Sequence, residues 1–332
     1  MNLNSHRRHR LRHFAIDQRG VAIITALLVV VLAAGIATYL LAQQSHALTR
    51  TARATGRAQA AQYAGPTLDY ARAVLFDAQK NKYVSYQQPW AQGITAMPIE
   101  NALASGVIRD EAGKFNLNNL VLNGAANQDD VKIFRQLLIN LDLNPDLSDA
   151  VVDWIDPDMQ PTPAGAEDSY YMNLPAPYRA ANQNMVQWQE LARVRGFDSK
   201  TLQRLAPFIT ALPVRTLINI NTAPQEVLAA LFPALAASDI TSIVTNRETQ
   251  PFLSIDPADM QKRPGLQKLS SAALNTIIPA ISVSSDYFLI LIGISSDASQ
   301  VAQTALVKRQ PQSAAPAGTP GAWPSIIWVQ TQ

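Results

Sequence analysis

The chain of 332 residues is long enough for more than one packed unit, and its 48% hydrophobic content argues against general disorder. It contains no cysteine, which excludes disulfides, thiolate metal sites and a cysteine nucleophile. The formal net charge of +2 is uneven, because residues 1–20 hold five arginines and one aspartate. The pI near 8.8 is therefore mostly a property of this segment and gives little support for a nucleic-acid partner.

Residues 21–42 contain no Asp, Glu, Lys, Arg or His. At about 1.5 Å per residue, a helix of this length spans roughly 30 Å, the thickness of a bilayer core. The arginine cluster before it predicts a cytoplasmic N-terminus and an exported body. Arg50, Arg53 and Arg57 follow the span, but they are fewer and more spread out, so the predicted orientation stands. No small-x-small cleavage site follows Ala42, unlike an ordinary secretory signal.

A glycine stands directly before the apolar run, in the stretch Gln18-Arg19-Gly20-Val21. A basic leader that ends in glycine before a long apolar run resembles the type IV prepilin-like signal. In that family a membrane aspartyl peptidase cuts after the glycine, and the apolar segment remains as the filament helix. The alternative is a plain signal anchor in which Gly20 is incidental.

Beyond the span, small and apolar residues recur at three- and four-residue spacing, namely Ala54, Ala58, Ala61, Gly65, Leu68, Ala71, Leu75 and Ala78. This stripe predicts that the helix continues to about residue 80 and packs through one face. The dipeptide Gly65-Pro66 predicts a bend within it.

Helical patterns predominate from about residue 115 to 280. The predicted helices are 128–141, 147–155, 187–194, 199–211, 224–231, 238–247 and 270–279. Residues 191–210 and 218–247 form a weak internal repeat that resembles two helix-hairpin-helix units. DNA-binding units of this kind use a glycine-rich turn to receive a phosphate. Here the second turn is Ala234-Leu235-Ala236, the first keeps only Gly196, and no basic cluster surrounds either, so no nucleic-acid binding is predicted.

Five carboxylates fall within sixteen residues of a loop that contains proline and glycine: Asp153, Asp156, Asp158, Glu167 and Asp168. Oxygen ligands on a flexible loop suit a hard cation, and calcium more than magnesium. No His or Cys is near, which disfavours zinc. Asp153 is the least secure member, because it can point away along its helix. The alternative is a solvated acidic loop with helix caps or salt bridges to Arg179 or Arg193.

The carboxy-terminal part predicts strands. Residues 287–294 are almost continuously apolar, residues 301–307 are a suitable antiparallel partner, and residues 326–329 form a last short strand. Between them, residues 311–322 are rich in Pro, Ala and Gly and are predicted to form a loop. These three strands are expected to lie against the N-terminal helix, and a first strand is expected before the helical region, within roughly residues 60–115.

Three motifs together resemble one known family. They are residues 110–120 (DEAGKFNLNNL), residues 218–224 (ININTAP), and the set WIDPD, GAEDSYY and PYRAAN at residues 154–158, 165–171 and 177–182. With the N-terminal signal, they resemble the K-type minor pseudopilins of the type II secretion system over nearly the whole chain.

The resemblance implies an α+β, type IV pilin-like fold with a large inserted α-helical domain. The leader would be residues 1–20, the transmembrane and stalk helix 21–80, and the first part of the pilin-like domain 81–115. The inserted domain would be residues 116–280, and the C-terminal strands 281–332. The protein would be a single-pass inner-membrane protein with its body in the periplasm.

The resemblance also implies partners and a position. Major pilins carry a Glu at the fifth mature position, and here Thr25 stands there, as is typical of the K type. A subunit without this Glu suits the filament tip, because the Glu pairs with a neighbouring terminal amine. The implied partners are the I- and J-type minor pseudopilins, the major pseudopilin, the prepilin peptidase and the inner-membrane assembly platform. Calcium is implied at the acidic loop.

An enzyme is not predicted. All four histidines lie at positions 6, 9, 13 and 46, in the leader or beside the span, so no Ser-His-Asp set forms in the body. The chain has no glycine-rich phosphate loop. The competing hypotheses are a periplasmic hydrolase that uses paired carboxylates of the acidic loop and a membrane-anchored helix-hairpin-helix protein for DNA binding or uptake.

The N-terminal motif predicts a mature protein that begins at Val21. Replacing Gly20 by a bulky residue should block processing and secretion. N-terminal sequencing of membrane-extracted protein tests this, and a mature terminus near residue 43 would contradict the pseudopilin hypothesis.

Overall fold

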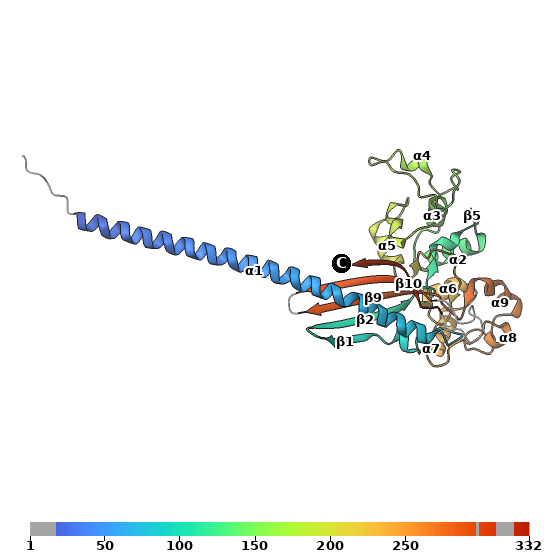
Figure 1. The fold of residues 1–332 in the computed structure, drawn as a ribbon. Helices are drawn as coiled ribbons and strands as arrows, with labels where there is room; N and C mark the ends of the chain where they lie inside the picture. Colours follow the sequence, from blue (N-terminus) through green and yellow to red (C-terminus); the bar gives the residue numbers. More distant parts are fainter. Residues whose placement is uncertain (1–17, 297–298, 310–321, 332) are drawn as a thin grey trace, which may run out of the picture. The chain divides into compact units, whose positions relative to one another are not determined.

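The computed structural model describes residues 18–296, 299–309 and 322–331 (Figure 1). The predicted leader lies almost entirely outside the described residues, and Gly20 and Val21 are described only as part of a helix. The chain divides into two units, residues 1–58 and 59–332, and each is described by itself.

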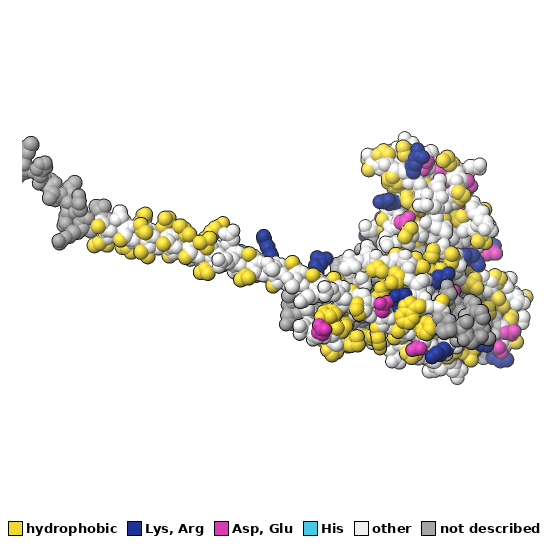
Figure 2. Space-filling view, viewed as in Figure 1, with side chains coloured by type: hydrophobic (Ala, Val, Ile, Leu, Met, Phe, Trp, Pro, Cys, Tyr) yellow, Lys and Arg dark blue, Asp and Glu magenta, His cyan; other side chains and the backbone are white. Residues whose placement is uncertain are grey.

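Helix α1 runs from Gln18 to Ala78. Within the described residues it is the one helix long and apolar enough to cross a membrane, with a mean hydropathy of 2.5 in its most apolar window. Figure 2 shows hydrophobic side chains along its first part. These properties are those of a single-pass membrane anchor. Pro66 lies inside the helix, which continues to Ala78.

A five-stranded antiparallel sheet lies against the last part of α1. Its strands are β1 (Ile94–Ile99), β2 (Ala102–Asp110), β9 (Tyr287–Ser296), β10 (Gln300–Lys308) and β11 (Ser325–Thr331), in the order β1-β2-β9-β10-β11. The predicted strands at 287–294, 301–307 and 326–329 are confirmed. A first strand was expected within residues 60–115, and this part supplies two, β1 and β2. Their bounds did not show in the sequence, because β2 contains Gly and Ala and β1 contains Pro98, which weaken the strand pattern.

Alternation along β9 sends Phe288, Ile290, Ile292 and Ile294 toward α1, where all four are buried. The buried helix face comprises Ala60, Ala64, Leu68, Ala71, Leu75 and Ala78. The predicted stripe was right from Leu68 onward and wrong before it, since Ala54, Ala58, Ala61 and Gly65 are exposed. Spacings of three and four residues fit several neighbouring helix faces, and only the position of the sheet selects one.

The region between β2 and β9 is mainly helical and has its own hydrophobic core. Its α-helices are α2 (Gln128–Asn140), α3 (Leu147–Ile155), α4 (Asp168–Tyr171), α5 (Ser199–Leu205), α6 (Gln225–Leu231), α7 (Ala237–Thr249), α8 (Pro257–Met260) and α9 (Ser271–Ile277). Short 3-10 segments lie at Pro89–Ala91, before the sheet, and at Leu117–Leu120, Trp188–Arg193 and Ile278–Ala280. Two-residue strands lie at Phe115–Asn116 (β3), Val121–Leu122 (β4), Ala125–Ala126 (β5), Ile209–Thr210 (β6), Ile218–Asn219 (β7) and Ile281–Ser282 (β8).

Each predicted helix has a helical segment at its place, and the predicted helix 199–211 was too long. Helix α5 ends at Leu205, shortly before Pro207, and Ile209–Thr210 instead pairs with Phe115–Asn116. Pro207 has no backbone N–H to continue the helical hydrogen bonds, which accounts for the early end. The structure is thus a mixed helix-and-sheet fold.

The asparagine-rich motifs form the join between the sheet and the helical region. Asp110, at the end of β2, accepts hydrogen bonds from Asn219 Nδ2 at 2.9 Å and Thr222 Oγ1 at 2.6 Å. A Cβ at Gly113 would come within 2.7 Å of Thr222 Oγ1, so only glycine fits this approach. The side-chain amide of Asn221 donates to the carbonyl of Phe252 and accepts from its backbone N–H.

Candidate functional site

The acidic loop begins where α3 ends. Asp156 has an extended backbone because Pro157 follows it, and this stops the helix at Ile155. The loop returns to the body at α4, whose N-cap is Glu167. The aromatic rings of Trp154, Tyr171 and Tyr178 pack against one another beside the loop and hold its two ends.

Three of the five predicted carboxylates come together. Asp156, Asp158 and Glu167 each place one carboxylate oxygen within 4.8 Å of the others. Asp156 and Glu167 are buried, and Asp158 is exposed. Asp156 Oδ1 and both oxygens of Glu167 have no hydrogen-bond partner although they are inaccessible. Buried polar atoms are normally satisfied, so leaving these three oxygens without a donor from the described residues is unfavourable.

The electrostatics of these carboxylates reflect burial and mutual repulsion. Burial, followed by repulsion from Asp158 and Asp153, raises the pKa of Asp156 from 3.8 to about 6. Burial, followed by repulsion from Asp153, Asp156 and Asp158, raises the pKa of Glu167 from 4.5 to about 7. Both effects disfavour the charged forms, and a cation between them would reverse both.

Asp153 lies at the edge of this cluster and has other partners. Its carboxylate accepts hydrogen bonds from Thr162, from the backbone N–H at 3.0 Å and from Oγ1 at 2.8 Å. A Cβ at Gly165 would lie 1.9 Å from Asp153 Oδ2, so glycine is required where the loop passes over it. Burial raises the pKa of Asp153.

Asp168 also has other partners. It accepts a hydrogen bond from the backbone N–H of Ala180 at 2.9 Å and lies 3.8 Å from Arg179. This is the salt bridge that the alternative hypothesis expected for the loop, and it involves only this member of the five. Asp168 therefore holds residues 168–180 together and is not among the three clustered carboxylates.

Two contacts that fasten the loop were not predicted from the sequence. Arg195 Nη1 donates to the carbonyl of Gly165 at 2.8 Å, and its guanidinium stacks over Tyr170. Thr162 anchors Asp153 as described. Thr162 stands in no motif, and Arg195 stands in the repeat at residues 191–210, which gave it no role in the loop. Each acts through a contact that exists only after the loop has folded.

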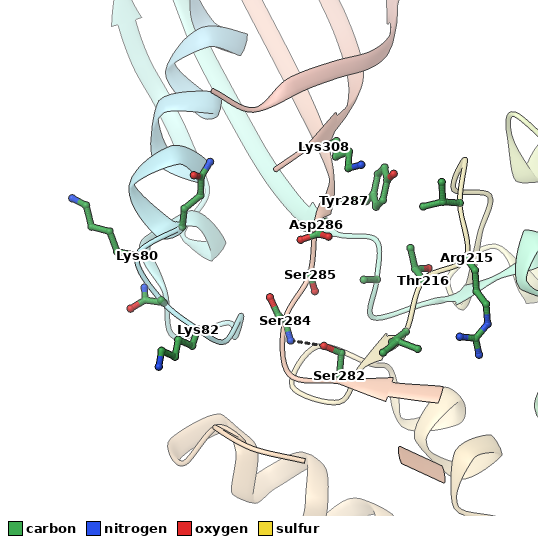
Figure 3. A pocket seen from close by; sticks show the side chains of 15 residues that line it. Lys80, Lys82, Arg215, Thr216, Ser282, Ser284, Ser285, Asp286, Tyr287 and Lys308 are labelled. Carbon is green, nitrogen blue, oxygen red and sulfur yellow. Dashed lines mark hydrogen bonds between the residues drawn. The ribbon is translucent and has the colours of Figure 1, made fainter. Parts of the chain in front are cut away.

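A separate cavity of about 860 Å³ lies beyond the end of α1 (Figure 3). Its lining includes Ser282, Ser284 and Ser285, with Lys80 and Arg215 at its sides. Lys80 lies 3.4 Å from Asp77, and Arg215 lies 3.1 Å from Asp130, so these two of the lining cations, which also include Lys82 and Lys308, already have counter-ions. The lining includes no histidine to activate the serines.

The turn between α6 and α7 was expected to lack a phosphate site. At the start of α7, Asp239 accepts a hydrogen bond from the backbone N–H of Ala236 at 3.3 Å and pairs with Lys268 at 2.8 Å. A carboxylate thus lies at the N-terminus of α7, where its negative charge would repel a phosphate.

Comparison with known proteins gives the class of this molecule. Two family models, both described as type II secretion system protein K, match residues 113–214 and 218–284. A protein K from Pectobacterium carotovorum is 32% identical over 308 residues, covering 87% of this chain and 92% of the relative. A protein K from Pseudomonas aeruginosa is 33% identical over 291 residues, covering 84% and 85%.

A solved structure agrees with these matches. It is a chain of the GspK-GspI-GspJ complex from enterotoxigenic Escherichia coli, with a TM-score of 0.72, 27% identity, and coverage of 85% of this chain and 99% of that one. The family models, the relatives and this structure together place the chain in the class of type II secretion system components. This chain belongs to the type II secretion system protein K family, whose members are minor pseudopilins.

The raised pKa values predict how stability depends on pH without added metal. Between about pH 4 and about pH 7 the unfolded chain has released the protons of Asp156 and Glu167 while the folded chain keeps them. The folded state then binds more protons, so the free energy of unfolding should fall as pH rises through this window. Chemical denaturation in chelator-containing buffer measures this.

The matched variants are Asp156→Asn and Glu167→Gln, which remove the titrating groups. Each should flatten the slope. A wild-type profile that is flat or rises across this window, or variants that keep the wild-type slope, would contradict the assignment of raised pKa values to this pair.

Proposed function

We propose that the protein caps the tip of the periplasmic pseudopilus and helps to initiate its assembly. The observation that carries this proposal is that no Asp or Glu lies between Val21 and Ala42, so that Thr25 stands where a filament carboxylate is expected. Thr25 Oγ1 donates to the carbonyl of Ala22 at 3.0 Å and so offers no charge. A terminal amine buried opposite this position would have no counter-ion, which disfavours any place below another subunit.

The proposed arrangement of the fold supports this role. The helix-plus-sheet part is a type IV pilin-like unit, and the region between β2 and β9 is its inserted domain. The pairs at 188–205 and 225–249 are helix-hairpin-helix-like units without a phosphate site. After cleavage at Gly20, α1 anchors the protein once in the inner membrane with the body in the periplasm.

The proposed partners are the I- and J-type minor pseudopilins, because the solved relative comes from a complex with GspI and GspJ. Further proposed partners are the major pseudopilin, the prepilin peptidase and the inner-membrane assembly platform. The small residues of α1 favour close helix packing of this kind.

Calcium at the acidic loop is part of the same proposal. Calcium binds oxygen ligands at about 2.3–2.6 Å, so one ion reaches oxygens that lie up to roughly 5 Å apart. The cluster of Asp156, Asp158 and Glu167 fits this limit, and its unpartnered oxygens fit a cation. These three residues would hold the ion, and the ion would neutralise their charge and close the loop.

The tip position predicts an ordered assembly. Mixed with the periplasmic domains of the I- and J-type subunits, this protein should form a complex of one copy each, measured by light scattering. Cross-links in assembled pseudopili should place it only at the end, and Thr25→Glu should still insert into the membrane. Cross-links to subunits on both sides along the filament would refute the tip position.

The calcium proposal predicts a rise in melting temperature. An ion that binds only the folded state stabilises it by about 2.7 kcal/mol at a hundredfold excess over the dissociation constant. Asp158→Ala and Glu167→Ala should each remove most of this response, and magnesium should substitute poorly. Asp168→Asn is the matched control and should keep the response, since Asp168 lies outside the cluster. No heat of binding in calorimetry at millimolar calcium would reduce the loop to an acidic surface.

A further inference from the structure

The part of α1 that follows the apolar run carries basic residues on one face. His46, Arg50, Arg53 and Arg57 are spaced by four, three and four residues, and a helix with 3.6 residues per turn brings these positions into one narrow stripe. We call these four positions the basic stripe. The side chains of His46, Arg50 and Arg57 are exposed. Figure 2 shows basic side chains standing out from α1 beyond its hydrophobic part.

No carboxylate of the same segment neutralises the basic stripe. The sequence contains no Asp or Glu from Val21 to Leu68. Within the described part of α1, the first ion pair along the helix is that of Arg72 with Asp69. Like charges three or four residues apart on a helix repel one another. The stripe therefore favours an anion from outside the helix.

The position of the stripe along the helix indicates which anion is near. If residues 21–42 fill the hydrocarbon core, His46 lies about 6 Å and Arg50 about 12 Å further along the axis. The headgroup layer is about 5–8 Å thick on each side. An arginine stem can bend back toward this layer and keep its charge in the polar zone. His46 and Arg50 therefore reach the level of lipid phosphates.

The two further positions require a tilted helix. Arg53 and Arg57 lie about 17 Å and about 23 Å beyond the core along the axis. Membrane helices tilt by up to about 40°, and a tilt that turns the stripe toward the membrane lowers both positions. Because all four positions share one face, a single direction of tilt serves them all.

We propose that the basic stripe binds the phosphate groups of anionic phospholipids in the leaflet next to Ala42, so that α1 leans toward the lipid on this face. Guanidinium groups match phosphate oxygens with two parallel hydrogen bonds. An anionic leaflet attracts each basic residue near its surface, and the attraction fades within a Debye length. The inference needs only that α1 spans a membrane, and it does not depend on the tip position or on calcium.

The chain has no cysteine, so Ala54→Cys in the full-length protein gives one attachment point for a nitroxide label beside the stripe. The labelled protein is reconstituted into vesicles of phosphatidylcholine alone or mixed with phosphatidylglycerol. We expect slower label motion and less access for a water-soluble relaxation agent in the mixed vesicles. This difference should disappear at high salt, where the Debye length falls to about 3 Å.

Matched variants separate charge from helix structure. The difference should be lost in Arg50→Gln/Arg53→Gln/Arg57→Gln and kept when the same three positions carry Lys. It should also be kept in Thr49→Gln/Thr51→Gln/Thr55→Gln, which changes positions outside the stripe. Equal spectra in the two kinds of vesicle, or a difference that survives the glutamine variant, would overturn the proposal.

Two further arms identify the anion. Inorganic phosphate added to neutral vesicles should leave the spectrum unchanged, and a full response there would assign the stripe to free anions instead of lipid. Partner pseudopilins added to neutral vesicles test a protein ligand. A response that appears with them and not with phosphatidylglycerol would assign the stripe to an acidic partner surface and overturn the lipid assignment.

Discussion

A single buried carboxylate joins the sheet to the helical region. Asp110 Oδ2 accepts hydrogen bonds from Asn219, Thr222 and Ser285, and Oδ1 accepts one from the backbone N–H of Ala112. Burial raises the pKa of Asp110, and these donors act in the opposite direction. Asp110 ends β2 and Ser285 stands just before β9, so this carboxylate holds both points where the chain passes between sheet and helical region. Removing it would take the printed acceptor from Ser285 Oγ, which is costly for a buried hydroxyl. Asn219 would keep its hydrogen bonds to Val84 and Ser285, and Thr222 its longer one to the carbonyl of Asn219.

Asp110 and Glu167 of the acidic loop are both buried carboxylates, but they differ in their hydrogen-bond partners. Asp110 is buried with its oxygens satisfied by neighbouring donors, and so it is complete within the chain. Glu167 is equally buried, and both its oxygens lack a partner. Two carboxylates that are similarly buried thus differ in their hydrogen bonding, because Asp110 has donors and Glu167 has none among the described residues. The first is a structural element of the fold, and the second supports the proposal that a cation belongs to the loop.

Helix α1 meets two different surroundings along its length. Its first part is apolar on every side and exposed in the isolated chain, as suits a lipid environment. From Ala60 onward one face is buried by the sheet, and small residues there allow a close approach. Between these parts lies the basic stripe, of which His46, Arg50 and Arg57 are exposed. The composition of the helix changes along its length accordingly, because lipid favours apolar side chains, a polar environment favours charged ones, and a packed sheet favours small ones.

The sequence by itself determined the features that depend on local pattern. Periodicity and proline positions predicted the apolar run, most helices and strands β9 to β11. The motifs indicated the family. The sequence also gathered five candidate carboxylates into one loop, but the tertiary structure decided among them. Asp153 accepts a hydrogen bond from Thr162, and Asp168 accepts one from Ala180 and forms a salt bridge with Arg179. The three carboxylates that lie together are those of Asp156, Asp158 and Glu167. Strands β1 and β2 and the buried face of α1 near Ala60 were likewise decided by packing. The reason is that spacing along the chain limits which side chains can meet, whereas burial and hydrogen-bond partners arise only when distant segments come into contact.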